Sequence, residues 1–181
     1  MILETLEDFQ KAVKSGKKIN VETKTIFFIN DDEEEKKKET FKVGEPYYVD
    51  GKVVGVVACV TLDGDEMEIL VTALEDLVKD INWSNACEKC ESLEHGFSMP
   101  NKSDICLIAA NMEKINAGLE KYGKPFQNDA YYWSSSEYSS SLAWYFCTGS
   151  GASQGGVDWL TKGLYNNHGV VRPVLKISRK I

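Results

Sequence analysis

The feature that most constrains the fold is an amphipathic helical pattern over residues 101–123. Its apolar residues recur at steps of three and four, as one face of a helix requires: Ile105, Ile108, Met112, Ile115 and Leu119. Asn101 can cap this helix, with Asp104 placed three residues later as in a capping box. Gly123, followed by Pro125, ends it. A chain with this segment must bury one helix face against other elements.

A shorter helix and several strands are predicted before that segment. Residues 83–93 place Ala86, Cys90 and Leu93 on one helical face. Further upstream, β-branched runs are separated by Asp-Gly pairs, which are typical of tight hairpin turns. These runs predict three strands, at residues 46–49, 53–61 and 67–73.

From residue 131 onward no helical pattern is present, and aromatic and β-branched residues alternate with Ser, Gly and Asn. The last strand is predicted over residues 169–177, where Pro173 lacks a backbone donor and favours an edge or a bulge. Two helices therefore pack on short antiparallel strands, with a loop-rich β region at the C-terminus. This arrangement predicts the α+β fold class.

The N-terminal part of the chain is predicted to form a separate extension. Residues 3–15 have helical spacing, residues 25–30 form a strand, and residues 31–39 are a run of charges that suits a solvated linker. We therefore expect a helix–strand extension with its linker over residues 1–40, and the main domain over residues 41–181.

Charge and composition bound the partners and the compartment. The net charge of −7 disfavours nucleic acid as a partner, since phosphate binding needs a basic surface. No stretch approaches the roughly 20 apolar residues of a membrane span, so we expect no membrane insertion. The N-terminus has acidic residues among its apolar ones, unlike a signal peptide. The five scattered cysteines favour reduced thiols and synthesis in the cytoplasm.

Residues 131–165 have the composition of an antibody-like contact surface, because Tyr, Trp and Ser are frequent and charged residues are few. We predict a ligand-binding face built between about residues 134 and 170, with residues 134–142 forming a loop at its rim. Trp133 and Trp144 are expected in the core as scaffold residues, and Arg172 in a structural ion pair. The candidate binding residues are Tyr138, Ser139, Ser140, Ser141, Tyr145, Cys147, Trp159, Tyr165, Asn166, Asn167 and His168.

Two motifs suggest chemistry, but their contexts argue against it. Residues 151–155 match G-x-S-x-G, with Asp158 and His168 after them, yet the nucleophile elbow needs a strand before it and a helix after it. Cys87 and Cys90 lack the second ligand pair of a zinc site, and their spacing favours buried structural thiols. No acidic cluster suits calcium. We expect no catalytic residue, metal or cofactor.

Several segments in a fixed order carry a family resemblance, between about residues 43 and 175: "GEPYYVDGKVVGVV", "TALED", "INWSNAC", "GFSMPNKSDICLI", "KINAGLEKYG", "YYWSSSEYSSSLAWYF" and "VVRPV". Together they resemble a bacterial and phage family with a C-type-lectin-like fold, related to formylglycine-generating enzyme. That family includes the variable proteins of diversity-generating retroelements, whose C-terminal segments are rewritten by adenine-directed mutagenesis. Oxidation of the formylglycine type would need a cysteine pair in the C-terminal half, and only Cys147 lies beyond Cys106.

The resemblance implies a non-enzymatic binding protein that displays or contacts a receptor, with an unidentified protein or glycan as ligand and the virion or cell surface as final location. If the segment is diversified, adenine-directed changes cannot create certain residue types, so these positions should be fixed: Trp133, Glu137, Trp144, Gln154, Trp159 and Lys162. The alternative is a structural component of a phage tail or surface appendage. An enzyme of the formylglycine-generating type ranks third.

Overall fold

The computed structural model describes residues 18–20, 27–29, 40–149, 156–163 and 169–180. By its contacts the chain divides into two units, Met1–Thr40 and Phe41–Ile181. In the first unit β1 (Lys18–Asn20) pairs antiparallel with β2 (Phe27–Ile29). The strand predicted at residues 25–30 is thus confirmed over its centre, and the helix predicted at 3–15 lies outside the described residues.

The first large sheet of the second unit contains the three predicted strands. β3 (Pro46–Val49), β4 (Lys52–Asp63) and β5 (Glu66–Ala73) form an antiparallel meander, and β10 (Val174–Lys180) joins it in the order β10-β5-β4-β3. Asp50 and Gly51 turn the first hairpin with φ values of 50° and 75°. Positive φ at both central residues is what a two-residue type I′ turn requires.

In the described residues, three α-helices follow β5: α2 (Trp83–Glu91), α3 (Lys102–Ala110) and α4 (Met112–Tyr122). The predicted capping box is present, because Asn101 Oδ1 accepts from Asp104 N and Asp104 Oδ2 accepts from Asn101 N. The single helix predicted over 101–123 is wrong. Asn111 interrupts it at φ −114° and ψ 10°, where its side-chain amide donates to Leu107 O and competes with the backbone ladder.

The second sheet contains β6 (Tyr131–Glu137), β7 (Leu142–Cys147), β8 (Val157–Thr161) and β9 (Gly169–Val170), in the order β8-β7-β6-β9. Its strands pair antiparallel, except that β9 is parallel to β6. The single strand predicted at 169–177 is wrong. Residues 171–173 carry the chain from one sheet to the other, and Pro173, which has no N–H, lies at this crossing between β9 and β10.

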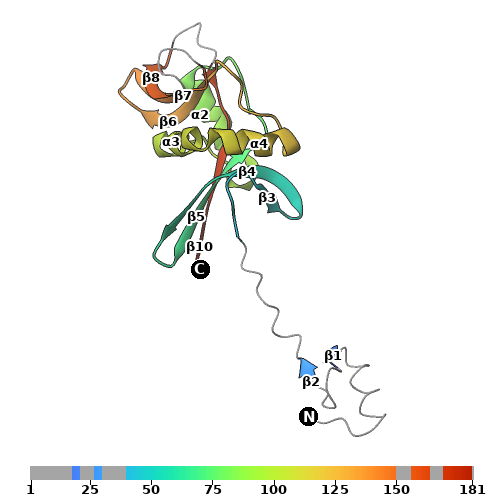
Figure 1. The fold of residues 1–181 in the computed structure, drawn as a ribbon. Coiled ribbons are helices and arrows are strands. Elements are labelled where there is room, and N and C mark those ends of the chain that lie inside the picture. The colour runs from blue at the N-terminus through green and yellow to red at the C-terminus, as the bar shows by residue number, and fades with distance from the viewer. Residues whose placement is uncertain (1–17, 21–26, 30–39, 150–155, 164–168, 181) are drawn as a thin grey trace. The chain divides into compact units, whose positions relative to one another are not determined.

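Helices α3 and α4 lie across the middle of the second unit, between the two sheets (Figure 1). α4 packs on β4, and α3 contacts both β4 and the strands β6, β7 and β8. The core between these layers is continuous and includes Val56, Leu70, Ile105, Ile115, Leu119 and Phe146. The opposite face of the second sheet has its own core with α2, which includes Ala86, Cys90, Trp133 and Tyr145. The fold is therefore mixed α+β, as predicted.

Candidate functional site

The second sheet presents two large aromatic side chains to solvent. Tyr138 is 52% exposed and Trp159 is 44% exposed. Their rings stack, with centroids 5.1 Å apart and planes inclined by 17°. Trp144 on β7 lies opposite Trp159 on β8. The rings of Tyr138 and Trp144 meet edge to face, with an interplanar angle of 78° and centroids 5.4 Å apart. We call Tyr138, Trp144 and Trp159 the aromatic patch.

The start of α3 supplies a cation to this patch. Lys102 Nζ lies 3.3 Å from the centroid of the Trp144 ring, within the range of a cation–π contact. The backbone of α3 is held there by the neighbouring strand, because Lys102 N donates to Ser136 Oγ at 3.0 Å and Ser135 N donates to Pro100 O at 2.7 Å. The patch is therefore bounded by a fixed helix terminus on one side.

A short turn carries Tyr138. Tyr138 N and Ser139 N both donate to Leu142 O, at 2.9 and 3.1 Å, and Leu142 N returns a bond to Ser139 O. Ser141 N donates to Ser139 Oγ inside the same turn. The loop predicted over residues 134–142 is thus wrong in extent, since residues 134–137 belong to β6 and only residues 138–141 turn. Cross-strand bonding fixes this boundary, which composition does not reveal.

Lys162, directly after β8, clamps this turn. Its Nζ lies 2.9 Å from Glu137 Oε2, donates to Ser140 O at 3.2 Å, and sits 4.4 Å from the centroid of the Trp83 ring. Its backbone N also donates to Ser141 O at 3.0 Å. Only 14% of the Lys162 side chain is exposed. One residue therefore joins the end of β8, the turn and the start of α2.

The structure brings only part of the predicted binding face to the surface. Ser140 and Ser141 are exposed beside Tyr138, and Ser139 is half-buried. Tyr145 and Cys147 are buried, at 8% and 6% exposure, so their prediction as exposed contact residues is wrong. Alternation along β7 turns both side chains toward the core with α2, where Tyr145 meets Tyr131 edge-on. Four further candidates lie outside the described residues: Tyr165, Asn166, Asn167 and His168.

The expected scaffold residues occupy two different environments. Trp133 is buried, and its Nε1 donates to Ile81 O at 3.0 Å. Trp144 is only half-buried, because its ring extends from the central core to the aromatic patch. It therefore serves as support and as part of the candidate surface.

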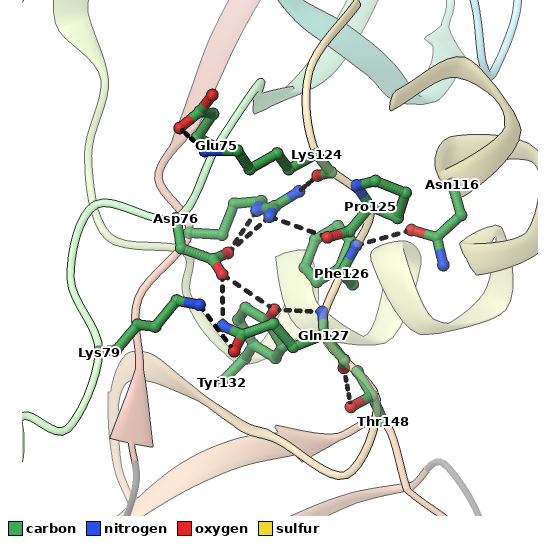
Figure 2. Close-up of polar contacts among 11 residues, drawn as sticks. Glu75, Asp76, Lys79, Asn116, Lys124, Pro125, Phe126, Gln127, Tyr132 and Thr148 are labelled. Atoms are coloured by element: carbon green, nitrogen blue, oxygen red, sulfur yellow. Dashed lines mark hydrogen bonds and ion pairs between the residues drawn. The ribbon is translucent and has the colours of Figure 1, made fainter. Parts of the chain in front are cut away.

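Arg172 forms the expected ion pair, and Figure 2 shows the polar network around it. Arg172 is 2% exposed. Its Nε lies 2.7 Å from Asp76 Oδ1, its Nη1 donates to Lys124 O at 2.7 Å, and its guanidinium lies 4.3 Å from the Phe126 ring centroid. This pairing ties the crossing between the sheets to the segment after β5 and to the chain after α4.

Sequence reasoning missed the partners in this network. Gln127 Nε2 donates to the second oxygen of Asp76 at 2.6 Å, and Gln127 N donates to the Tyr132 hydroxyl at 2.8 Å. Burial, with a smaller contribution from the Asp76 carboxylate, raises the pKa of Tyr132 to about 12. Asp76 is set apart only by its ion pair with Arg172, which lies 96 residues away. A sequence gives no signal of a pairing over that distance.

Of the motifs that suggested chemistry, the structure describes the Cys87–Cys90 pair. Burial raises the pKa of the Cys90 thiol to about 11 and also raises that of Cys87, so both stay protonated near neutral pH. No group of three or more His, Cys, Asp or Glu side chains in the described part of the chain is arranged to hold a metal. The G-x-S-x-G segment, residues 151–155, lies outside the described residues.

Comparison with known proteins adds no family to these observations: no protein-family model matches the chain, and no curated protein is significantly similar to it. Among the described residues, no helix is long and apolar enough to cross a membrane. Within the described chain, the aromatic patch is the arrangement that best suits recognition.

Proposed function

We propose that this protein binds a ligand without catalysing a reaction, and that the aromatic patch is its contact surface. The observation that carries the proposal is the stack of Tyr138 on Trp159, two exposed rings held on a clamped turn. Trp and Tyr dominate the binding energy of protein interfaces, because their large surfaces gain much from leaving water.

The clamp by Lys162 supports the same proposal. A surface that is already ordered loses less conformational entropy on binding, so more of the contact energy appears as affinity. The charges beside the turn are engaged with each other, since Lys162 pairs with Glu137. Apart from the exposed Lys102 at the edge of the patch, the exposed groups are ring faces and the hydroxyls of Ser140 and Ser141, which suit an uncharged part of a protein or a glycan.

We also propose that residues 41–181 form a C-type-lectin-like domain. The sequence resemblance supports this, together with the order of elements, in which a β meander is followed by α2, α3 and α4 and then by a second sheet. An experimental structure that superposes on C-type-lectin-like domains through both sheets would support the assignment. Matching helices with a different strand order would contradict it.

The binding proposal is tested by selecting ligands with the wild-type protein and then comparing variants. A glycan array and a phage-displayed peptide library serve as the two probes. We expect Tyr138→Ala and Trp159→Ala each to weaken binding of a selected ligand at least about tenfold, as loss of a hot-spot residue does. Tyr48→Ala is the matched control, because Tyr48 is 54% exposed on β3 in the other sheet.

Two outcomes would contradict the proposal. Selected ligands could bind both patch variants as tightly as wild type, or Tyr48→Ala could weaken binding equally. If instead the patch variants alter the oligomeric state of the protein and no ligand is selected, the patch is an assembly contact. That result would favour a structural component of a larger particle over a ligand-binding protein.

The proposed link to diversity-generating retroelements has a separate test. A reverse transcriptase gene near the coding region, with a near-repeat of its 3′ segment, would support it. The absence of both would contradict the link and would leave the binding proposal standing, since that rests on the aromatic patch.

A further inference from the structure

Three sulfur-containing residues line one hollow of the second unit. Cys87 and Cys90 lie on α2, and Met99 lies in the segment that leads into α3. All three line a hollow of about 450 Å³. The Cys87 Sγ atom lies 3.8 Å from Met99 Sδ. The hollow is separate from the aromatic patch, because its sulfurs belong to the core between α2 and the opposite face of the second sheet.

The local structure holds these groups in place. Residues three apart share one face of a helix, so Cys87 and Cys90 both face the hollow. Met99 is fixed on both sides along the chain. Ser98 exchanges two backbone hydrogen bonds with Val174, at 2.8 and 2.9 Å, and Pro100 O accepts from Ser135 N at 2.7 Å. The thioether is thus held beside the thiols by two strands that belong to different sheets.

We propose that Cys87, Cys90 and Met99 form a three-sulfur site for a soft monovalent metal ion, Cu(I). Thiolate and thioether sulfurs are the ligands that select Cu(I) over hard cations. Two sulfurs 3.8 Å apart can both lie within about 2.3 Å of an ion placed between them, a usual metal–thiolate distance. The site would use a methionine as its third ligand, which sets it apart from a zinc site built of cysteine and histidine.

Burial of two of the three ligands suits this ion. Cys90 and Met99 are buried, so the ion would be shielded from water, and half-buried Cys87 would form the entrance. Binding requires both thiols to lose their protons, which leaves one net negative charge on two thiolates and one Cu(I). Lys176 lines the same hollow, where its Nζ pairs with Asp104 Oδ2 at 2.9 Å, and the Glu91 carboxylate lines it as well. The ammonium of Lys176 is therefore already paired and leaves the net charge of the complex uncompensated.

The test is an anaerobic titration of the full chain with Cu(I) against a chromophoric Cu(I) chelator. We expect wild type to retain one equivalent. Removing a residue that only supports a metal ligand weakens metal affinity about 10–100-fold. Cys87→Ser and Cys90→Ser remove a ligand itself, so each should weaken Cu(I) affinity by more than about 100-fold. Met99→Leu conserves volume and should weaken binding less. Cys106→Ser is the matched control, because Cys106 is an exposed thiol on α3.

Because Cys90 is buried, the Cys90→Ser variant could fail to fold. Thermal unfolding of wild type and Cys87→Ser gives a second measurement that does not need that variant. Cu(I) should raise the melting temperature of wild type by mass action and leave that of Cys87→Ser unchanged. The proposal is overturned if wild type loses Cu(I) to the chelator, if Cys106→Ser weakens binding as much as Cys87→Ser, or if Zn(II) displaces Cu(I) from the protein. These results leave the proposed ligand-binding function untouched, since the patch is elsewhere.

Discussion

Lys162 Nζ lies 2.9 Å from Glu137 Oε2, and this pair joins the end of β8 to the end of β6. The two residues enclose the turn that carries Tyr138, and the lysine also bonds to Ser140 O. The exposed ring of the candidate site is therefore positioned by a side chain that is itself almost covered.

Replacing Lys162 should loosen this turn. In Lys162→Met the ion pair and the bond to Ser140 O are lost, while the apolar stem can still cover Trp83. We expect the amide protection of Tyr138 and Ser139 in hydrogen exchange to fall about fivefold, the factor that corresponds to roughly 1 kcal/mol. Lys124→Met, which removes an exposed pair with Glu75, should leave that protection unchanged. Equal protection in Lys162→Met and wild type would contradict the clamp.

Breaking the buried pair of Arg172 and Asp76 should be costly. Arg172→Met leaves the Asp76 carboxylate buried and uncompensated, which typically lowers the free energy of unfolding by about 3–5 kcal/mol. Denaturant unfolding measures this change. The control is again Lys124→Met, because an exposed ion pair contributes only about 0–1 kcal/mol. A loss below about 1 kcal/mol in Arg172→Met would show that the network in Figure 2 is not needed for stability.

Gly118 on α4 should resist a substitution that normally favours helices. A Cβ there would overlap the carbonyl oxygen of Gly44, which itself has φ 89°. Alanine is a better helix former than glycine by about 1 kcal/mol, yet overpacking costs about 1–3 kcal/mol, so Gly118→Ala should be destabilising. Ala117, the exposed neighbour, is the comparison. Ala117→Gly should also lower the stability of the protein, but only because glycine is a poorer helix former than alanine. Thermal unfolding that found Gly118→Ala more stable than wild type would contradict this close packing.

The buried hydroxyl of Tyr132 should make the fold sensitive to alkali. Burial raises the pKa of Tyr132 to about 12 from an ordinary value of 10.0, so the folded state holds this proton more tightly than the unfolded state. The stability it contributes is complete below pH 10 and is lost as pH rises from 10 toward 12. The loss is on the order of 2–3 kcal/mol.

Denaturant unfolding of wild type and Tyr132→Phe across this pH range checks the alkaline effect. The variant should be less stable than wild type at pH 8, because Gln127 N loses its acceptor. Between pH 10 and 12 the variant should lose less stability than wild type, because it lacks the Tyr132 hydroxyl that ionises there. Parallel stability curves for the two proteins would show that another group controls the alkaline limit.

Features that depend on neighbouring residues were predictable from the sequence. The reciprocal cap of Asn101 and Asp104 spans three residues, and the Asp50–Gly51 turn needs only positive φ at adjacent positions. The strands β3, β4 and β5 and the starts of α2 and α3 followed from the same local rules. The break between α3 and α4 at Asn111 is also local, but it could not be seen in the sequence. The apolar residues keep their helical spacing across Asn111, because both helices bury one face in the same core.

The candidate site was predictable in composition and not in geometry. The sequence indicated a Tyr- and Ser-rich surface, but strand pairing decided that Tyr138 and Trp159 stack outward while Tyr145 and Cys147 turn inward. A one-residue change of register would exchange those two faces.

By itself, then, the sequence determined the α+β class, the capping box of α3 and the hairpin turns, because each follows from patterns of residues close along the chain. The tertiary structure alone decided that Arg172 meets Asp76 across 96 residues, and that Lys162 returns to the turn beside Glu137. Such contacts depend on which strands become neighbours when the core closes, and that choice is made by burial over the whole unit.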